Sequence, residues 1–166
     1  MKRNNSLRLM TASGIMASVI FLLTAYLHIP SHTGYTHIGD AFVYLSACLL
    51  PTPYAFFAGA IGATLADCLT GFAIWAPASA VIKGLTCLFF SSKVRKIICV
   101  RNLLSLIPAW ALCIGGYFAY DAVITGTVSA AVLGIPGYVT QCIASSIVFI
   151  AVGLSFDRLS IKSKFI

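Results

Sequence analysis

Apolar segments of about membrane-spanning length constrain the fold of this chain more than any other feature. A helix that crosses the hydrocarbon core of a bilayer needs about 20 mostly apolar residues. Candidate spans lie at residues 9–29, 39–50, 54–70, 76–90, 99–119 and 137–157. Only 9% of the residues are charged, against roughly 25% in soluble domains. The sequence therefore predicts an integral membrane protein.

The number of spans depends on Pro51 and Pro53, which interrupt an otherwise continuous apolar run over residues 41–66. The basic residues decide between one span and two, because lysine and arginine accumulate in cytoplasmic loops. With six spans, both chain ends and the basic cluster at 93–101 lie on one side. Merging the two segments would move that cluster to the opposite side. We therefore predict an all-α bundle of six transmembrane helices with both termini cytoplasmic, forming a single membrane domain over residues 1–166.

The outward loops of this arrangement are residues 30–38, 71–75 and 120–136, and none of them contains lysine or arginine. They hold polar and aromatic side chains instead, among them Tyr35, His37, Trp75 and Asp121. Aromatic rings and hydrogen-bonding groups around a concave site suit a small ring-shaped ligand. A tryptophan at a membrane boundary is also a common belt residue, and this alternative remains open for Trp75.

Lys83 lies within a predicted span, where a charged side chain costs several kcal/mol unless it is paired or faces water. We expect it to reach Asp40 or Asp67, either as a structural ion pair or as part of a ligand site. Asp40 stands at a helix start, where capping of free backbone N–H groups is the favoured role. Gln141 must hydrogen-bond either a neighbouring helix or a ligand.

Several function classes find no support in the sequence. The net charge of +7 follows from membrane topology, and no nucleic-acid-binding module accompanies it. The six cysteines lack metal-ligand spacing and are interpreted as small apolar residues. No motif of a metalloprotease, a serine hydrolase or a nucleotide-binding loop is present. We expect no enzymatic activity, cofactor or metal.

Four short motifs carry a family resemblance. In chain order they are GYxHxGDAxxYL from Gly34, GxxGxxxAD from Gly59, GFxxWAP from Gly71 and IKGL from Ile82. They resemble the substrate-binding S components of energy-coupling-factor (ECF) vitamin transporters over about residues 9–157. The resemblance is to the riboflavin-type branch, which includes members assigned to hydroxymethylpyrimidine or pyridoxine. The chain departs from that pattern at Phe72, where relatives tend to have tyrosine, and at Tyr138, where they often have asparagine.

The resemblance implies a multi-pass protein of a prokaryotic plasma membrane that captures a vitamin outside the cell, beneath its first outer loop. It also implies partners, namely a transmembrane coupling subunit and two ATPases, with which the vitamin is delivered inward. The favoured ligand is pyridoxine or a hydroxymethylpyrimidine-like heterocycle. The residues expected to contact the coupling subunit are Ala12, Ser13 and Ala17. The residues expected to bind substrate are Tyr35, His37, Asp40, Tyr44, Asp67, Trp75, Lys83, Tyr117, Asp121 and Gln141.

Two other functions remain as alternatives. A small membrane enzyme acting on lipid-linked substrates would need an aspartate or histidine cluster at the cytoplasmic face. In the six-span topology, Asp157 is the single acidic residue at the cytoplasmic face. A ligand-free scaffold protein would use the polar outer residues as helix caps and belt residues only.

Overall fold

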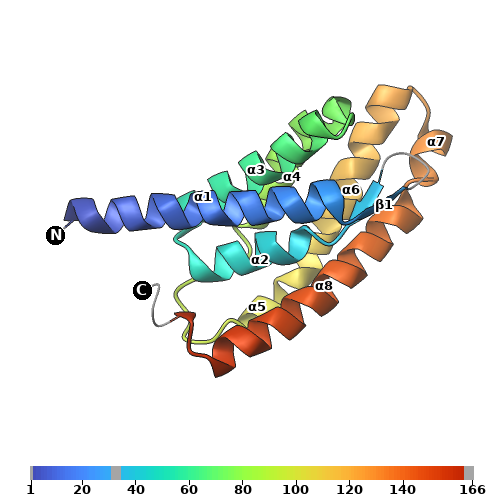
Figure 1. Ribbon diagram of the computed structural model, residues 1–166. Coiled ribbons are helices and arrows are strands. Elements are labelled where there is room, and N and C mark those ends of the chain that lie inside the picture. The colour runs from blue at the N-terminus through green and yellow to red at the C-terminus, as the bar shows by residue number, and fades with distance from the viewer. Residues whose placement is uncertain (1, 31–34, 163–166) are drawn as a thin grey trace.

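The computed structural model describes residues 2–30 and 35–162 as helices joined by short connections, with one small hairpin (Figure 1). The long helices are α1 (Lys2–Tyr26), α3 (Thr52–Leu69), α6 (Leu106–Thr125) and α8 (Ile135–Arg158). The shorter helices are α2 (Asp40–Leu49), α4 (Ala76–Thr86), α5 (Val100–Leu104), α7 (Val128–Val132) and the single 3-10 turn η1 (Ala73–Trp75). The two strands are β1 (His28–Pro30) and β2 (Tyr35–His37).

Prolines and a left-handed glycine set the helix ends that matter most. Pro51 is the N-cap of α3 and Pro53 follows in its first turn, so α2 and α3 are separate helices as the charge argument requires. Pro77 takes the equivalent place in the first turn of α4. Helix α6 ends at Gly126, whose φ of 70° lies in the left-handed region that favours glycine. The fifth predicted span thus becomes α5 and α6, and extends to Thr125.

Three helical segments in the described part of the chain are long and apolar enough to cross a membrane: Asn5–Tyr26, Val100–Thr125 and Val128–Arg158. The other predicted spans correspond to α2, α3 and α4. With 10 and 11 residues, α2 and α4 are too short to cross a bilayer alone. Helix α2 is buried on nearly all sides by the other helices. Because it packs against protein and not against lipid, it does not need the length of a membrane-spanning helix. The all-α membrane bundle is confirmed, whereas the cytoplasmic placement of the termini stays a prediction.

Close helix contacts bring α1 against α3 and α3 against α4. Gly62 shows why a small residue is needed, since a Cβ at this position would lie 2.6 Å from the carbonyl oxygen of Ala17 on α1. The apolar core lies around α2, where Leu45 and Cys48 are fully buried. Small residues at a helix interface allow backbones to approach this closely.

The β-hairpin was not predicted, because residues 30–38 were assigned only as an outward loop. Strands β1 and β2 pair antiparallel with His28 opposite His37 and Ile29 opposite Thr36. Gly34, which opens the first family motif, lies outside the described residues. The hairpin stands at one end of the bundle, close to α7 and to the start of α8 (Figure 1).

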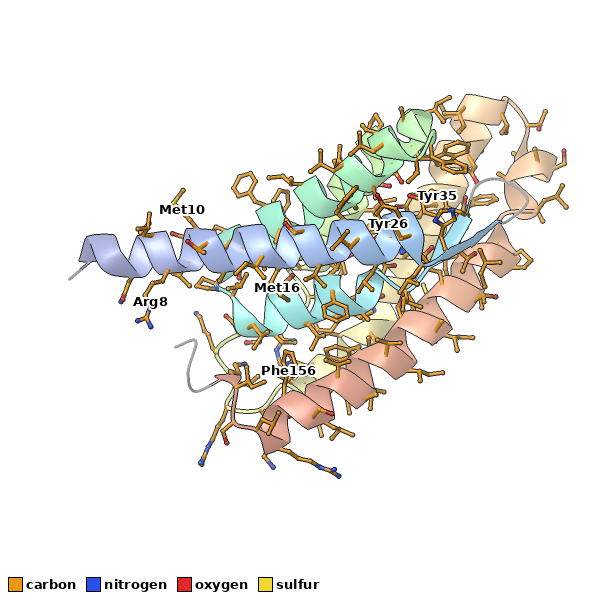
Figure 2. All side chains as sticks on the ribbon, in the orientation of Figure 1. Arg8, Met10, Met16, Tyr26, Tyr35 and Phe156 are labelled. Atoms are coloured by element: carbon orange, nitrogen blue, oxygen red, sulfur yellow. The ribbon has the colours of Figure 1, made fainter. Side chains whose placement is uncertain are left out.

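The opposite end of the bundle holds the start of α1 and the end of α8 (Figure 1). The Asp157 carboxylate near the end of α8 accepts backbone N–H bonds from Ile97 at 2.8 Å and Ile98 at 2.9 Å, which fixes the basic loop at this end. Arg8 and Tyr35 accordingly lie at opposite ends of the molecule (Figure 2). The start of α1 and the basic loop at 93–101 therefore lie at one end and the hairpin stands at the other, as the six-span arrangement requires.

Candidate functional site

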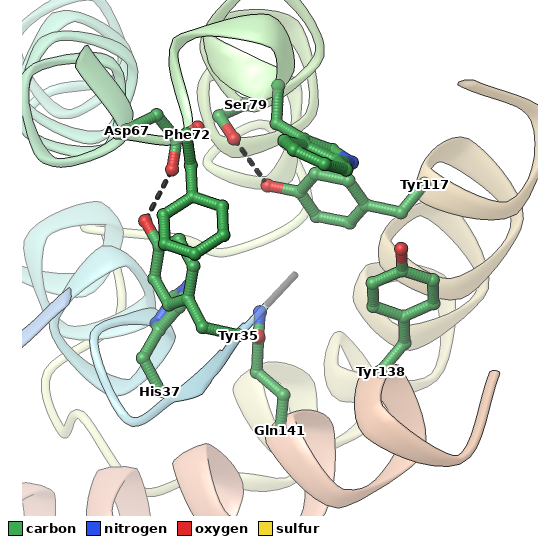
Figure 3. Close-up of a pocket in the computed structure, with 9 residues that line it drawn as sticks. Tyr35, His37, Asp67, Phe72, Ser79, Tyr117, Tyr138 and Gln141 are labelled. Carbon is green, nitrogen blue, oxygen red and sulfur yellow. Dashed lines mark hydrogen bonds between the residues drawn. The ribbon is translucent and has the colours of Figure 1, made fainter. Parts of the chain in front are cut away.

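A cavity lies at the hairpin end of the bundle, between β2 and the ends of α3, α4, α6 and α8 (Figure 3). It encloses about 340 Å³ of empty space, a volume that includes open solvent at its mouth. Six elements, namely β2, α3, η1, α4, α6 and α8, contribute to its wall together with the loop between α3 and η1. The lining residues are Tyr35, His37, Asp67, Phe72, Trp75, Ser79, Tyr117, Tyr138 and Gln141.

The hairpin covers one side of the cavity through Tyr35 and His37. The Tyr35 hydroxyl donates a hydrogen bond to Oδ1 of Asp67 near the end of α3 (Figure 3). Burial and the neighbouring Asp67 charge raise the pKa of Tyr35, so the phenol keeps its proton and remains a donor. The Tyr35 ring also lies 4.6 Å from the Phe72 ring, centroid to centroid. The hairpin is thus attached to α3 and to the loop that follows it.

His37 is neutral and has a defined tautomer. Its Nδ1 accepts the backbone N–H of Gly39 at 3.1 Å, so the ring proton resides on Nε2. Burial lowers the pKa of His37 to about 4, and this effect outweighs the attraction of the nearby Asp40 carboxylate. At neutral pH, His37 therefore offers an uncharged N–H donor.

The opposite wall is aromatic. Tyr117 of α6 and Tyr138 of α8 stack with ring centroids 5.3 Å apart and planes 19° apart. Asp121 lies behind this wall, fully buried, and accepts hydrogen bonds from Trp75 Nε1 at 2.8 Å and from the Tyr138 hydroxyl. It orients two rings and does not itself line the cavity. Trp75 is a cavity residue, and a role as a belt residue alone is wrong.

The floor of the cavity is a buried polar cluster that joins α2, α4 and α8. Lys83 Nζ lies 2.8 Å from Oδ1 and 2.9 Å from Oδ2 of Asp40. Gln141 Nε2 donates to Oδ2 of Asp40 at 2.9 Å. The ammonium group also lies 4.9 Å from the centroid of the Tyr117 ring. All three residues of the cluster are at most 2% exposed, but only Gln141 lines the cavity.

This cluster corrects one expectation and decides another. Asp40 is the first residue of α2, and its carboxylate accepts from Lys83 and Gln141, so the expectation that it caps the helix is wrong. The expected pairing of Lys83 with either aspartate is decided in favour of Asp40. Asp67 is instead bonded to Tyr35. Of the two roles considered for Lys83, a structural ion pair or a ligand-binding group, the structure therefore favours the ion pair.

The cavity contains six of the ten residues expected to bind substrate: Tyr35, His37, Asp67, Trp75, Tyr117 and Gln141. Asp40, Lys83 and Asp121 lie directly behind it. Tyr44 was assigned wrongly, because it points into the apolar core and stacks on Phe90 at 5.0 Å, with Phe149 at its edge. Tyr44 lies four residues after Asp40, so the two side chains share one face of α2. That face extends from the cavity into the apolar core, and Tyr44 lies in the part that faces the core.

Sequence reasoning left three lining residues out of the expected site: Phe72, Ser79 and Tyr138. Helical spacing could have identified two of them. Ser79 precedes Lys83 by four residues and Tyr138 precedes Gln141 by three, so each shares a face with an expected site residue. Ser79 and Tyr117 are joined through their hydroxyl groups at 2.7 Å (Figure 3). Phe72 follows a left-handed glycine, and only the packing of its loop brings it to the cavity.

A second depression lies between α1 and α3 on the outer surface and holds about 970 Å³ of space. Ser13 and Ala17, expected to contact the coupling subunit, line it together with Gly14. Ala12 is turned away and packs against the apolar core. No group of three His, Cys, Asp or Glu side chains within residues 2–30 and 35–162 is placed to hold a metal ion.

Comparison with known proteins gives one match. The sequence model of a family described as "ECF-type riboflavin transporter, S component" matches residues 4–157. A search of curated proteins found no match. The matched range contains every residue that lines the cavity.

Proposed function

The chain belongs to the family of ECF-type riboflavin transporter S components, and from this premise we propose that its cavity captures a small single-ring vitamin or vitamin precursor. Proteins of this family are membrane-embedded, substrate-binding transporter subunits and not enzymes. The ligand that we propose is pyridoxine or a hydroxymethylpyrimidine-like heterocycle, bound at the hairpin end on the outer side. A transmembrane coupling subunit and two ATPases would complete the importer.

The observation that carries the proposal is a cavity bounded by five aromatic rings beneath a hairpin. Tyr35 and Phe72 lie on one side, and Tyr117 and Tyr138 lie on the other (Figure 3). Trp75 connects the two sides, because its ring lies 5.9 Å from that of Phe72 and its Nε1 donates to Asp121. Aromatic faces bind flat rings by offset stacking, whereas a few fixed polar groups select the orientation. The alternative of a ligand-free scaffold protein does not account for the buried Asp121 carboxylate, which holds the Trp75 and Tyr138 rings at the edge of the cavity.

The size of the cavity supports a single ring. Its empty space of about 340 Å³ includes the mouth, so the enclosed part is smaller still. A tricyclic ring with a sugar-alcohol chain would require the hairpin or the Phe72 loop to move outward. A pyridine or pyrimidine would require the smallest opening between the two aromatic walls, with its substituents toward Asp67 and Gln141.

The proposal predicts specific binding by the purified protein. Native mass spectrometry after mild detergent extraction should detect one vitamin-sized molecule on each chain, and added pyridoxine or hydroxymethylpyrimidine should bind with saturation. Phe72→Leu should weaken binding about tenfold or more, because stacking on this ring is lost. The matched control is Phe57→Leu, since Phe57 is 59% exposed on the outer face of α3. Absence of any bound vitamin, or equal loss in both variants, would contradict the proposal.

A further inference from the structure

The amide of Gln141 can adopt only one orientation in the floor of the cavity. Asp40 is paired with the Lys83 ammonium group through both oxygens, at 2.8 and 2.9 Å, and therefore has no proton to donate. The Gln141 atom that lies 2.9 Å from Oδ2 of Asp40 must then be the donor, Nε2. The carbonyl oxygen Oε1 is consequently turned away from Asp40. Because Gln141 lines the cavity, Oε1 remains there as an acceptor.

A second acceptor in the cavity is unsatisfied. Asp67 is 5% exposed, and its Oδ1 is used by the Tyr35 hydroxyl. Its Oδ2 is buried and has no hydrogen-bond partner in the described part of the chain. An unsatisfied buried carboxylate oxygen is costly, so a donor supplied by a ligand would be favoured at this position.

Most donors of the cavity wall are already engaged, and the exception is the Nε2–H group of His37, whose Nδ1 accepts the Gly39 N–H. Trp75 Nε1 and the Tyr138 hydroxyl both donate to Asp121, and the Tyr35 hydroxyl donates to Asp67. Ser79 and Tyr117 share one hydrogen bond, and the Ser79 hydroxyl also lies near the Asp67 side chain. The cavity therefore presents two fixed acceptors, one of them charged, and His37 Nε2–H as its main free donor.

We infer that the Lys83–Asp40 pair sets the ligand preference of this site by locking Gln141 as an acceptor, so that the cavity selects a neutral or cationic ring with an amino group. Lys83 and Asp40 are positioning residues here, because they act through Gln141 and do not line the cavity. This inference rests on the proposed function and refines it. Among pyrimidines it favours the amino form over the oxo form, whose carbonyl oxygen would face an acceptor. It also disfavours riboflavin, whose pyrimidine edge presents two carbonyl oxygens.

The test compares two ligands that differ in one group. The first is the aminopyrimidine form of hydroxymethylpyrimidine, and the second is its oxo analogue, in which a carbonyl replaces the exocyclic amine. Isothermal titration of the purified full-length chain in detergent should give at least about tenfold tighter binding of the amino compound. Riboflavin, titrated in parallel, should bind no better than the oxo analogue.

Variants then test the positioning role. In the double variant Asp40→Asn with Lys83→Met, no ionic acceptor holds the amide, so Gln141 can turn and the ratio of the two affinities should fall to within about threefold. Asp121→Asn is the control, because it loosens Trp75 and Tyr138 and should weaken both ligands alike without changing their ratio. Gln141→Met removes the acceptor itself and should abolish the preference even if the double variant does not fold.

Each outcome decides a separate claim. Equal or tighter binding of the oxo analogue or of riboflavin to the unaltered chain would overturn the inference and leave vitamin capture intact. A full amino preference in the folded double variant, or in Gln141→Met, would overturn the role given to the Lys83–Asp40–Gln141 cluster. If the chain binds none of these compounds and no other vitamin, the proposed function itself fails.

Discussion

His37 shows how a single residue can be both structural and available to a ligand. Its Nδ1 accepts the N–H of Gly39 immediately before α2, while the ring lines the cavity. A Cβ on Gly39 would lie 2.1 Å from Thr24 Oγ1 and 3.1 Å from His37 Nδ1, so glycine is needed where the hairpin enters the bundle. The sequence indicated that His37 and Gly39 belong together, because they lie two residues apart in one motif. It did not indicate the hydrogen bond that makes the histidine neutral.

The burial of His37 predicts a defined pH dependence of stability. Its pKa is about 4 in the folded protein and near 6.5 in the unfolded chain, so only the unfolded chain takes up the proton between these values. The free energy of unfolding should therefore be highest above pH 6.5 and fall as the pH approaches 4. One pH unit of difference in pKa corresponds to about 1.4 kcal/mol, so the loss should reach about 3 kcal/mol at most.

Denaturation of the detergent-solubilised protein at several pH values measures this loss. His37→Asn keeps an acceptor for Gly39 but cannot titrate, so subtracting its profile removes the contribution of the carboxylates. Parallel profiles of the two proteins between pH 6.5 and 4 would contradict the burial of a neutral histidine.

At the scale of elements, the Lys83–Asp40 pair connects α4 to α2, and Gln141 connects both to α8. Removing one partner of a buried ion pair leaves an uncompensated charge, which typically costs 3–5 kcal/mol. Lys83→Ala should therefore lower the free energy of unfolding by about this amount and reduce the yield of folded protein. The control is Lys93→Ala in the exposed basic loop, which should change stability by less than about 0.5 kcal/mol. Equal stability of both variants would show that the pair does not hold the helices together.

The depression between α1 and α3 is the surface that we propose for the coupling subunit. Gly14 lines it, and a Cβ at this position would meet nothing within 4 Å, so a larger side chain can be added without disturbing the fold. Gly14→Leu should therefore leave vitamin binding unchanged but weaken assembly with the coupling subunit and the ATPases. Co-purification of the complete importer measures the second effect, and titration of the isolated chain measures the first. Normal assembly of Gly14→Leu would place the coupling surface elsewhere.

At the scale of the whole molecule, the sequence was most informative where physics restricts the choices. Span lengths, Pro51 and the basic clusters predicted a helical bundle with the basic loops at one end, since these depend on local composition. The site was predicted in part, because motif residues such as Asp67 and Trp75 lie near helix ends that converge. Tyr44 could not be assigned from helical phase alone, since one face of α2 passes from the cavity into the core. The choice of Asp40 over Asp67 as the partner of Lys83 depends on helix packing, which no local pattern specifies.

The central claim is that the hairpin end, where the vitamin enters, faces outside while the basic loops face the cytoplasm. Side-selective thiol labelling in intact cells tests it most directly. In a chain whose exposed Cys68 and half-buried Cys99 are replaced by serine, single cysteines replace Ile29 in β1, which is 72% exposed, and the exposed Lys93. An impermeant reagent should label the cysteine at position 29 in intact cells and the one at position 93 only after permeabilisation. Labelling of both positions in intact cells, or of position 93 alone, would contradict capture of a vitamin from outside.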